Sequence, residues 1–347
     1  MTSSVPQPFR DLDPARVLAT LEAAGLDCDG RLQALNSFEN RVYFVGLHDG
    51  GSRVAKFYRP GRWSDAQIRE EHAFAAELAD AEIPVVAPLP LADGQTLFCA
   101  NGHRVAVFPR QGGRVPELDN ARDGAAIRDR IGQFIARIHT VGARRRFAVR
   151  PALTPDSHAR QPIAVVRASG LLTDEAADAW IAVATRCADR IAERYDAIVG
   201  RDGCATLRLH GDCHLGNLLW TDHGAHFVDL DDARTGPAAQ DLWMLADAGA
   251  ANDHSPAGAS AEWAELIAGY ERIRDFDRRE LALVETLRTM RMLHYCGWLA
   301  ERWQDPAFPA AFPWFGTPRY WQDQIIALRE QLERLDEPAQ QYGFDDT

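Results

Sequence analysis

Two short segments, both rich in polar oxygen atoms, set the first limits on how this chain folds. His210–Asn217 reads HGDCHLGN, and Phe227–Asp232 reads FVDLDD. Asp212 and Asn217 stand five residues apart, a spacing with which one compact loop can present a carboxylate and an amide oxygen. Asp229 follows an apolar, strand-like stretch and offers a second carboxylate. We therefore expect a loop and a strand end that together present three oxygen-bearing side chains.

These three side chains suit one chemistry in particular. Asp212 can accept a proton from a hydroxyl group, and Asn217 and Asp229 carry the hard oxygen ligands that Mg²⁺ prefers. The ordered set matches the template for phosphoryl transfer, in which an aspartate, an asparagine and a second aspartate cooperate. Turn-forming Asp and Asn residues would explain one such position but not the set. A transition-metal site at His210, Asp212 and His214 is a weaker reading, because no further ligand stands at a suitable offset.

Lys56 is the second informative residue. It is the only lysine among 38 basic residues, and it lies in the strand-like segment Arg53–Tyr58. Base composition of the genome explains the arginine bias, but a buried strand is a poor place for a charge without a role. A compact cation on a flexible stem suits phosphate oxygens. We expect Lys56 to bind the phosphates of ATP, and Val54 on the same strand face to contact adenine.

A helix after this strand supplies the expected partner of Lys56. Ser64 and Gln67 form a capping box, and the helical pattern runs to about Asp80. Glu71 lies on the face of this helix that also carries three apolar residues, namely Ile68, Ala75 and Leu78. A carboxylate on an apolar face needs a cation. The pattern therefore predicts an ion pair between Glu71 and Lys56.

The order of elements along the chain predicts an α+β fold. The strand-like stretches are Arg41–Leu47, Arg53–Tyr58, Thr96–Cys99 and His103–Phe108. Turn-rich residues 48–52 and the Asn101-Gly102 pair join them into two hairpins. The helical patterns are Ala125–Thr140, Thr173–Tyr195, Ala261–Arg274 and Arg278–Trp303, interrupted by a β-like insert at Leu207–Asp232. We expect two domains, a nucleotide-binding lobe at 1–108 and a catalytic and substrate lobe at 109–347.

Six segments resemble those of the aminoglycoside-phosphotransferase-like kinases, and in particular the bacterial Ser/Thr protein kinases of that fold. They are Leu35–Tyr43 (LNSFENRVY), Val54–Pro60 (VAKFYRP), Arg208–Asn217 (RLHGDCHLGN), Phe227–Arg234 (FVDLDDAR), Gly236–Met244 (GPAAQDLWM) and Asp305–Pro309 (DPAFP). The resemblance spans nearly the whole chain. It implies a bilobal, protein-kinase-like α+β fold of the aminoglycoside phosphotransferase type, with a small β-rich N-lobe and a larger α-helical C-lobe.

The same resemblance implies roles for single residues. Asp212 would be the proton acceptor and, with Asp229, a catalytic residue; Asn217 and Asp229 would bind Mg²⁺. Lys56 would bind the ATP phosphates, and Glu71 would orient Lys56. Ser37 would lie over the ATP phosphates. Residues 105–110 would pair with adenine, and Asp241 is expected to cap a helix and brace the catalytic loop rather than to catalyse. The resemblance further implies a bacterial stress-response kinase that phosphorylates protein Ser/Thr and also itself.

Two features depart from the protein-kinase pattern. The nucleotide loop around Asn36 and Ser37 contains no glycine, so polar side chains, including that of Asn40, have to help hold the phosphates. Leu-Asp follows Asp229 where protein kinases have Phe-Gly, and Asp241 already opens the next helical pattern. This leaves little room for a long activation loop. We therefore expect that phosphorylation between Asp229 and Asp241 does not activate the enzyme.

The acceptor is the least constrained part of this interpretation, because one fold can serve many substrates. The C-terminal region is rich in aromatic residues, namely Tyr295, Trp298, Trp303, Phe308, Phe312, Trp314, Phe315, Tyr320 and Trp321. Packing of a core explains them best, and a cage for a quaternary ammonium group is the alternative. A small-molecule kinase of the choline, homoserine or aminoglycoside type therefore stays open. A catalytically silent nucleotide-binding module is disfavoured by the intact set of catalytic residues.

Composition excludes several other classes of protein. A net charge of −12 disfavours nucleic-acid binding, although it would suit a basic substrate. The short basic cluster Arg144–Arg146 is more typical of a solvated helix end than of a nucleic-acid site. The six cysteines form no C-x-x-C pair and are expected to be reduced thiols. No apolar run is long enough for a membrane span, and the first residues lack a signal-peptide core, so we expect a cytoplasmic protein. We also expect a monomer.

Overall fold

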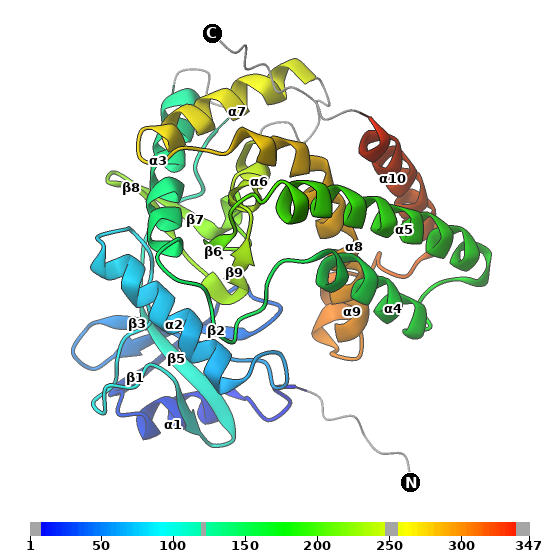
Figure 1. Ribbon diagram of the computed structural model, residues 1–347. Coiled ribbons are helices and arrows are strands. Elements are labelled where there is room, and N and C mark those ends of the chain that lie inside the picture. Colours follow the sequence, from blue (N-terminus) through cyan, green and yellow to red (C-terminus); the bar gives the residue numbers. More distant parts are fainter. Residues whose placement is uncertain (1–7, 119–122, 247–255, 338–347) are drawn as a thin grey trace. The chain divides into compact units, whose positions relative to one another are not determined.

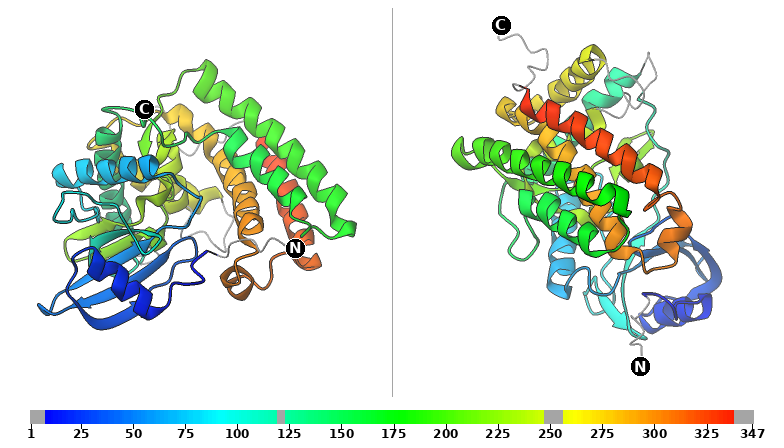
Figure 2. Two further views of the ribbon diagram at one scale, coloured as in Figure 1. Left: turned by 90° about the horizontal axis from the view of Figure 1, so that it is seen from below. Right: turned by 90° about the vertical axis from the view of Figure 1, so that its right-hand side faces the viewer.

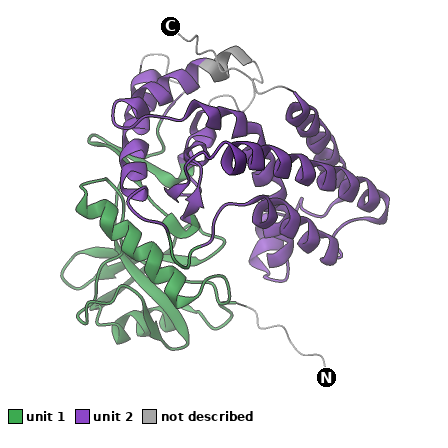
Figure 3. Cartoon of the chain, in the orientation of Figure 1, with its two compact units in different colours: residues 1–116, 147–150, 216–232 green, residues 117–146, 151–215, 233–347 purple. Residues whose placement is uncertain are grey.

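The computed structural model describes residues 8–118, 123–246 and 256–337, with side chains omitted for residues 256–260. The chain divides into two units, and each is assembled from separate stretches of sequence (Figure 3). The first unit comprises residues 1–116, 147–150 and 216–232, and the second comprises residues 117–146, 151–215 and 233–347. The division therefore differs from the predicted continuous domains 1–108 and 109–347.

An antiparallel sheet of five strands forms the centre of the first unit, in the order β1-β2-β3-β5-β4 (Figure 1). The strands are β1 (Cys28–Ala34), β2 (Arg41–Leu47), β3 (Ser52–Phe57), β4 (Phe98–Ala100) and β5 (His103–Pro109). The four predicted strands are confirmed to within two residues at each end. Asn101 and Gly102 both have positive φ, 50° and 82°, as expected for the two-residue turn between β4 and β5.

Two helices cover the two faces of this sheet. On one face, α1 (Pro14–Ala23) buries Val17 and Leu21 against inward-facing residues of β2, β3 and β5. On the other face, α2 (Asp65–Asp80) buries Ile68 beside residues that follow β3 or belong to β5. Side chains on a strand alternate between the two faces, so neighbouring residues of β3 face different helices. The predicted capping box at the start of α2 is confirmed.

A hairpin from much later in the sequence completes the first unit. Its strands are β7 (Leu218–Thr221) and β8 (Gly224–Phe227). The amide of Phe227 donates a hydrogen bond of 2.7 Å to the carbonyl of Pro84. Trp220 and Arg114 exchange two backbone hydrogen bonds of 2.6 and 3.0 Å. These bonds join the hairpin to the N-terminal segment, so the hairpin belongs to the first unit although it comes much later in the sequence.

The second unit is mostly helical. Its α-helices are α3 (Gly124–Gly142), α4 (Gln161–Ala168), α5 (Asp174–Tyr195), α6 (Trp243–Ala246), α7 (Pro256–Glu271), α8 (Val284–Arg302), α9 (Ala307–Ala311) and α10 (Pro318–Asp336). Within this unit α3 lies against α7, α4 against α8, and α5 against α10, as Figure 2 shows for the last pair. Two short antiparallel strands complete it, β6 (Leu207–Leu209) and β9 (Arg234–Gly236). No helix in the described parts of the chain has the length and apolarity needed to cross a membrane.

The predicted helix Arg278–Trp303 is wrong in its first turns. The chain forms a 3-10 segment at Arg278–Leu283 before α8 begins. The carboxylate of Asp277 accepts a hydrogen bond from the amide of Arg279 at 3.1 Å, which fixes the start of this segment. Glu280 is buried and accepts a hydrogen bond from the amide of Ala239 at 2.8 Å. The local hydrogen bond of Asp277 and the tertiary hydrogen bond of Glu280 thus replace the regular helical turn that the sequence pattern suggests.

The aromatic C-terminal region packs largely as a core. Phe308, Phe315 and Trp321 are almost fully buried, and their rings contact other aromatic rings of the same region. Tyr295 and Trp314 lie at its rim, with 38% and 43% of their surfaces exposed. All six cysteines are free thiols, as predicted.

Candidate active site

In the second unit, the loop after β6 is fixed by a buried carboxylate. Asp241 accepts hydrogen bonds of 2.8 Å from the backbone amides of both His210 and Gly211. His139 of α3 lies 3.1 Å from the same carboxylate through its Nε2 atom. Gly211 has a φ of +89°, which a residue with a side chain adopts only at a cost. The loop that presents Asp212 is therefore rigid at its base.

The electrostatics of Asp241 favour its charged form. Burial raises its pKa, but the hydrogen bond and charge of His139, the charge of His210 and the amide of Gly211 outweigh burial. The pKa of Asp241 consequently lies below its ordinary value. Asp241 braces the loop as predicted, but it is not a helix N-cap. It ends the 3-10 segment Ala238–Asp241, and both of its carboxylate oxygens point to the loop.

Asp212 stands on this loop with its carboxylate partly exposed. Arg291 of α8 donates a hydrogen bond to its Oδ1 atom. His214 lies 3.4 Å from its Oδ2 atom through Nε2. The side chain of Asp212 is 24% exposed, so solvent or an acceptor group can reach it. Asp212 was predicted from the sequence but Arg291 was not, because nothing in the local pattern marks an arginine that stands 79 residues away.

In the first unit, Lys56 lies on β3, and its buried ammonium group contacts two carboxylates. Its Nζ atom is 2.8 Å from Asp229 Oδ1 and 3.1 Å from Asp231 Oδ1. Burial lowers the pKa of Lys56, but the charges of Asp229 and Asp231 outweigh burial and hold its pKa well above the ordinary value. The prediction that Lys56 has a specific partner is correct. The identity of that partner, however, differs from the predicted one.

Glu71 does not form the predicted ion pair with Lys56. Among the ion pairs within 4 Å in the described chain, those of Lys56 are with Asp229 and Asp231. Glu71 is buried on α2 as expected, and burial raises its pKa to about 7 against the opposing charges of Lys56 and Arg150. The negative charge of Glu71 nevertheless contributes to the raised pKa of Lys56. The two aspartates form the ion pairs with the ammonium group of Lys56, and Glu71 acts on it only from a greater distance.

Asn217 and Asp229 flank the open end of the β7–β8 hairpin. The amide of Val228 donates a hydrogen bond of 3.0 Å to the carbonyl of Asn217, so Asp229 follows directly after the residue opposite Asn217. Asp229 adopts a left-handed backbone conformation with φ of 61°, which aspartate tolerates better than most residues. Its side chain is 53% exposed. The hairpin thus places an amide and an exposed carboxylate at one end.

The oxygen-bearing side chains at this end suit a hard divalent cation. Asn217 and Asp229 would hold it, since Mg²⁺ prefers one or two protein oxygen ligands and completes its shell with phosphates and water. The described residues contain no group of three or more His, Cys, Asp or Glu residues that could hold a metal ion.

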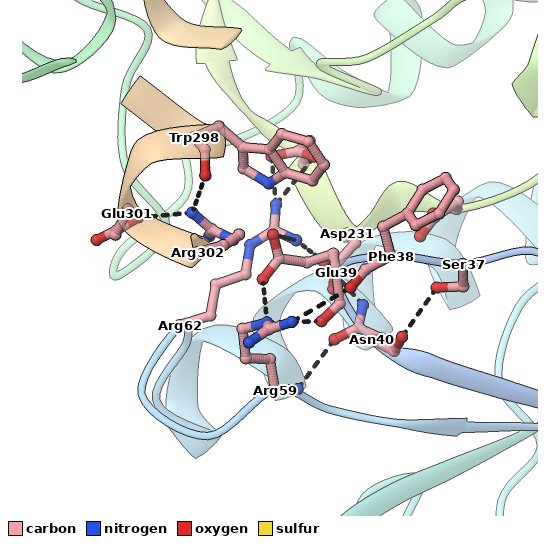
Figure 4. A network of polar contacts seen from close by, with 12 residues as sticks. Ser37, Phe38, Glu39, Asn40, Arg59, Arg62, Asp231, Trp298, Glu301 and Arg302 are labelled. Carbon is pink, nitrogen blue, oxygen red and sulfur yellow. Dashed lines mark hydrogen bonds and ion pairs between the residues drawn. The ribbon is translucent and has the colours of Figure 1, made fainter. Parts of the chain in front are cut away.

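The glycine-free nucleotide loop is held by arginines, as Figure 4 shows. Arg59 donates to the carbonyls of Glu39 and Phe38 at 2.8 and 3.2 Å, and Arg41 also donates to the carbonyl of Phe38 at 3.1 Å. Ser37 donates its hydroxyl to the carbonyl of Asn40 at 3.2 Å. Side chains therefore fix this loop, and the expectation that its polar side chains help hold phosphates stays a prediction.

A buried network joins this loop to the segment after Asp229 (Figure 4). Arg62 lies 3.4 Å from Glu39, 2.7 Å from Asp231 and 2.9 Å from Asp232. Asn40 donates a hydrogen bond of 3.2 Å to Asp231 and thereby links the loop to the same residue. Arg62 and Asp231 were not predicted as site residues. The two-residue spacing of Asp229 and Asp231 after an apolar strand was the available signal.

The remaining predicted positions lie on the sheet or just after the hairpin. Val54 is opposite Phe44 of β2 and Phe108 of β5, and it shares the sheet face of Lys56. Residues 105–110 fall mostly in β5. Their contacts with adenine stay predictions. Between Asp229 and Asp241 the chain forms two 3-10 turns and β9, so this span is occupied by short regular elements.

Comparisons with known proteins show the family and the fold of the chain. A model of the phosphotransferase enzyme family matches residues 31–281. Stress response kinase A of Salmonella choleraesuis (strain SC-B67) and serine/threonine protein kinase RdoA of Salmonella typhimurium (strain LT2) are each 42% identical to the chain, over 96% of both partners. The solved amicoumacin kinase hAmiN, in complex with AMP-PNP, Ca²⁺ and Ami, aligns with a TM-score of 0.68 over 92% of this chain and 93% of its own, at 16% identity. The predicted α+β fold of the aminoglycoside phosphotransferase type is confirmed.

Proposed function

Because this chain belongs to the phosphotransferase enzyme family, we propose that it is an ATP-dependent Ser/Thr protein kinase of a bacterial stress response. Membership of this family supports an activity that transfers a phosphoryl group. Similarity to a serine/threonine protein kinase along 96% of the chain supports a protein hydroxyl as the acceptor. The resemblance of the fold to amicoumacin kinase hAmiN supports only the shared architecture.

The observation that carries this proposal is the burial of Lys56 between Asp229 and Asp231, in the unit whose hairpin also holds Asn217. A buried lysine with two carboxylates is a costly arrangement that a core does not need. In the proposed function Lys56 binds the phosphates of ATP, which then share its charge with Asp229. Val54 contacts adenine, and Ser37 lies over the phosphates.

The proposed reaction is a single displacement at phosphorus. The acceptor hydroxyl gives its proton to Asp212, and its oxygen forms a bond to the γ-phosphorus of ATP. The bond from the γ-phosphorus to the bridging oxygen breaks, and ADP leaves with that oxygen. Asn217 and Asp229 would hold Mg²⁺, which supplies charge neutralisation on the phosphate oxygens. Asp241 keeps the loop of Asp212 in place during this step.

A panel of acceptors with labelled ATP tests the proposal. The panel contains a generic protein substrate, the enzyme alone, the amino alcohols choline and homoserine, and aminoglycosides. We expect label on protein Ser/Thr, including that of the enzyme itself, and loss of this label with Asp212→Ala. Label that appears only on a small molecule would refute the protein acceptor while leaving the phosphotransferase assignment intact. Label on none of the acceptors would favour a nucleotide-binding module without catalysis.

A further inference from the structure

The helix α8 brings an arginine to the proposed proton acceptor from outside the shared family region. The family model ends at residue 281, and α8 begins at Val284. Arg291 of this helix donates a hydrogen bond to Oδ1 of Asp212. Arg291 thus lies outside the family region, whereas the residues proposed to transfer the phosphate lie within it. This placement suits a residue that selects the acceptor rather than one that binds ATP.

Arg291 keeps part of its guanidinium accessible. Its side chain is 41% exposed, and Asp212 is its ion-pair partner within 4 Å among the described residues. His214 lies beside the other oxygen of the same carboxylate. An arginine carries five donors in a planar fork, so one contact with Asp212 leaves further donors for a second carboxylate. The cation therefore stands where a group attached to the acceptor hydroxyl has to pass.

Aromatic side chains continue the same face of α8. Tyr295 and Trp298 follow Arg291 by four and seven residues and therefore share its face of the helix. Their rings stack, with centroids 5.7 Å apart and planes 17° apart. Trp298 contacts Phe312, and Phe312 contacts Trp314, at centroid distances of 5.9 Å. We call Arg291, Tyr295 and Trp298 the α8 acceptor face.

We propose that the α8 acceptor face selects a polypeptide acceptor in which an acidic residue stands beside the phosphorylated Ser or Thr. This inference rests on the proposed function, because it requires Asp212 to accept the proton of a protein hydroxyl. A carboxylate beside the hydroxyl binds the free donors of Arg291, and an apolar residue of the peptide lies on Tyr295 and Trp298. Cationic acceptors such as choline or aminoglycosides are repelled by Arg291 at the point of transfer.

The spacing on the helix gives the spacing on the peptide. Seven residues of α-helix span about 10 Å, since each residue rises about 1.5 Å. An extended peptide covers about 3.3 Å per residue. The acidic residue and the apolar residue of the acceptor are therefore expected about three positions apart. A short helical face of this kind is matched by an extended segment rather than by a small molecule.

The overall charge of the protein does not oppose this selection. The net charge of −12 is a sum over the whole chain and does not describe the surroundings of Arg291. Charges farther apart than about 8 Å are largely screened at physiological ionic strength, whereas Arg291 would contact the acceptor directly. Arg291 therefore decides the charge of the peptide residue that is accepted beside the hydroxyl. A basic residue, which the net charge of the protein would favour, is not expected at this position.

Three peptides test the proposal directly. They share one Ser and one apolar residue three positions away, and they differ only in a Glu, Gln or Lys beside the Ser. With the unmodified enzyme we expect kcat/KM to fall in the order Glu, Gln, Lys. The Glu-to-Lys ratio should fall by about fivefold or more in Arg291→Gln, the worth of one partly exposed ion pair, and Arg291→Lys should keep the order. Arg291→Gln also lowers kcat for all three peptides, because Arg291 contacts Asp212.

Arg288→Gln is the matched control on the same helix. Arg288 pairs with Glu285 at 3.2 Å and lies over the ring of Trp243, so its replacement should leave the peptide ratio unchanged. The KM for ATP should stay constant in both variants. Equal kcat/KM for the three peptides, or a ratio unaffected by Arg291→Gln, would overturn the α8 acceptor face while leaving the protein kinase in place. Transfer to no peptide or protein at all, with transfer to a small molecule, would overturn the proposed function as well.

Discussion

The charges of single residues in the site depend on burial and on the ion-pair partners of each residue. Lys56 is charged in a buried position because Asp229 and Asp231 surround it. Asp231 is itself buried, yet Lys56 and Arg62 hold its pKa below the ordinary value although burial alone would raise it. Each of these charges is tolerated only while the others are present. Replacement of one therefore affects both catalysis and stability.

Lys56→Met should show both effects. It removes the cation that would bind the ATP phosphates, so kcat/KM for ATP should fall by about a hundredfold or more. It also leaves Asp231 with fewer cations, which should lower the free energy of unfolding by roughly 3 kcal/mol. Steady-state kinetics and denaturant unfolding measure the two quantities. An unchanged KM and kcat for ATP would contradict the role of Lys56.

Asp212→Ala should separate catalysis from binding. Asp212 is partly exposed and its loop is fixed by Asp241, so the fold should survive the replacement. Transfer should fall by several orders of magnitude, as it does when one member of a cooperating set is removed. Nucleotide affinity, followed by calorimetry, should stay near that of the unmodified enzyme. Full transfer activity in this variant would refute Asp212 as the proton acceptor.

At the scale of elements, sequence patterns correctly predicted the features that depend on interactions between neighbouring residues. The capping box of α2 and the Asn101-Gly102 turn depend on neighbours in sequence, and both were predicted correctly. The 3-10 start before α8 depends on Glu280 and its bond to Ala239, 41 residues away. The pairing of Lys56 with Asp229 likewise joins residues 173 positions apart. Pairings of this kind follow from the tertiary fold, and the spacing of Asp229 and Asp231 after an apolar strand indicates a pair of carboxylates without indicating its partner.

Arg62→Gln should loosen the nucleotide loop. The variant loses the contacts that join Glu39 of the loop to Asp231 and Asp232. We expect the KM for ATP to rise by about tenfold, with a smaller change in kcat, because the loop has to be ordered on binding. Arg69→Gln is the control, since Arg69 is half-exposed on α2 and its pair with Asp65 is long, at 3.9 Å. Equal KM values in the two variants would argue against the network.

Activation of the enzyme should not require a phosphate between Asp229 and Asp241. This span consists of two 3-10 turns and β9, so it offers no long loop that a phosphate could order. Protein purified with and without phosphatase treatment should have the same activity. Mass spectrometry should find no phosphate on Thr235 that correlates with activity. A phosphate there that raises the rate would refute this expectation.

At the scale of the whole molecule, buried carboxylates link stability to pH. Burial raises the pKa of Glu280 to about 7, against the opposing hydrogen bond from Ala239, and its ordinary value is 4.5. The folded protein therefore keeps a proton that the unfolded chain loses between these two values. The contribution of Glu280 to stability is complete below pH 4.5 and is lost as the pH rises through about 7.

Glu280→Gln should remove this dependence. The glutamine side chain stays neutral at every pH and still offers an oxygen to the amide of Ala239. Relative to the unmodified protein, the free energy of unfolding of the variant should rise between about pH 5 and pH 8, by about 3 kcal/mol at most. Urea unfolding at a series of pH values measures this difference. A difference that does not change with pH would show that Glu280 is ionised alike in both states.

The assembly of the first unit from three stretches of sequence has a consequence for biosynthesis. While the ribosome is still making the early part of the chain, the strand that carries Lys56 lacks both of its counter-charges. The β7–β8 hairpin and the two aspartates emerge only after much of the helical unit has been made. The first unit therefore has to wait for distant residues before it becomes native. Nascent chains stopped before residue 232 are expected to be targets for chaperones and proteases.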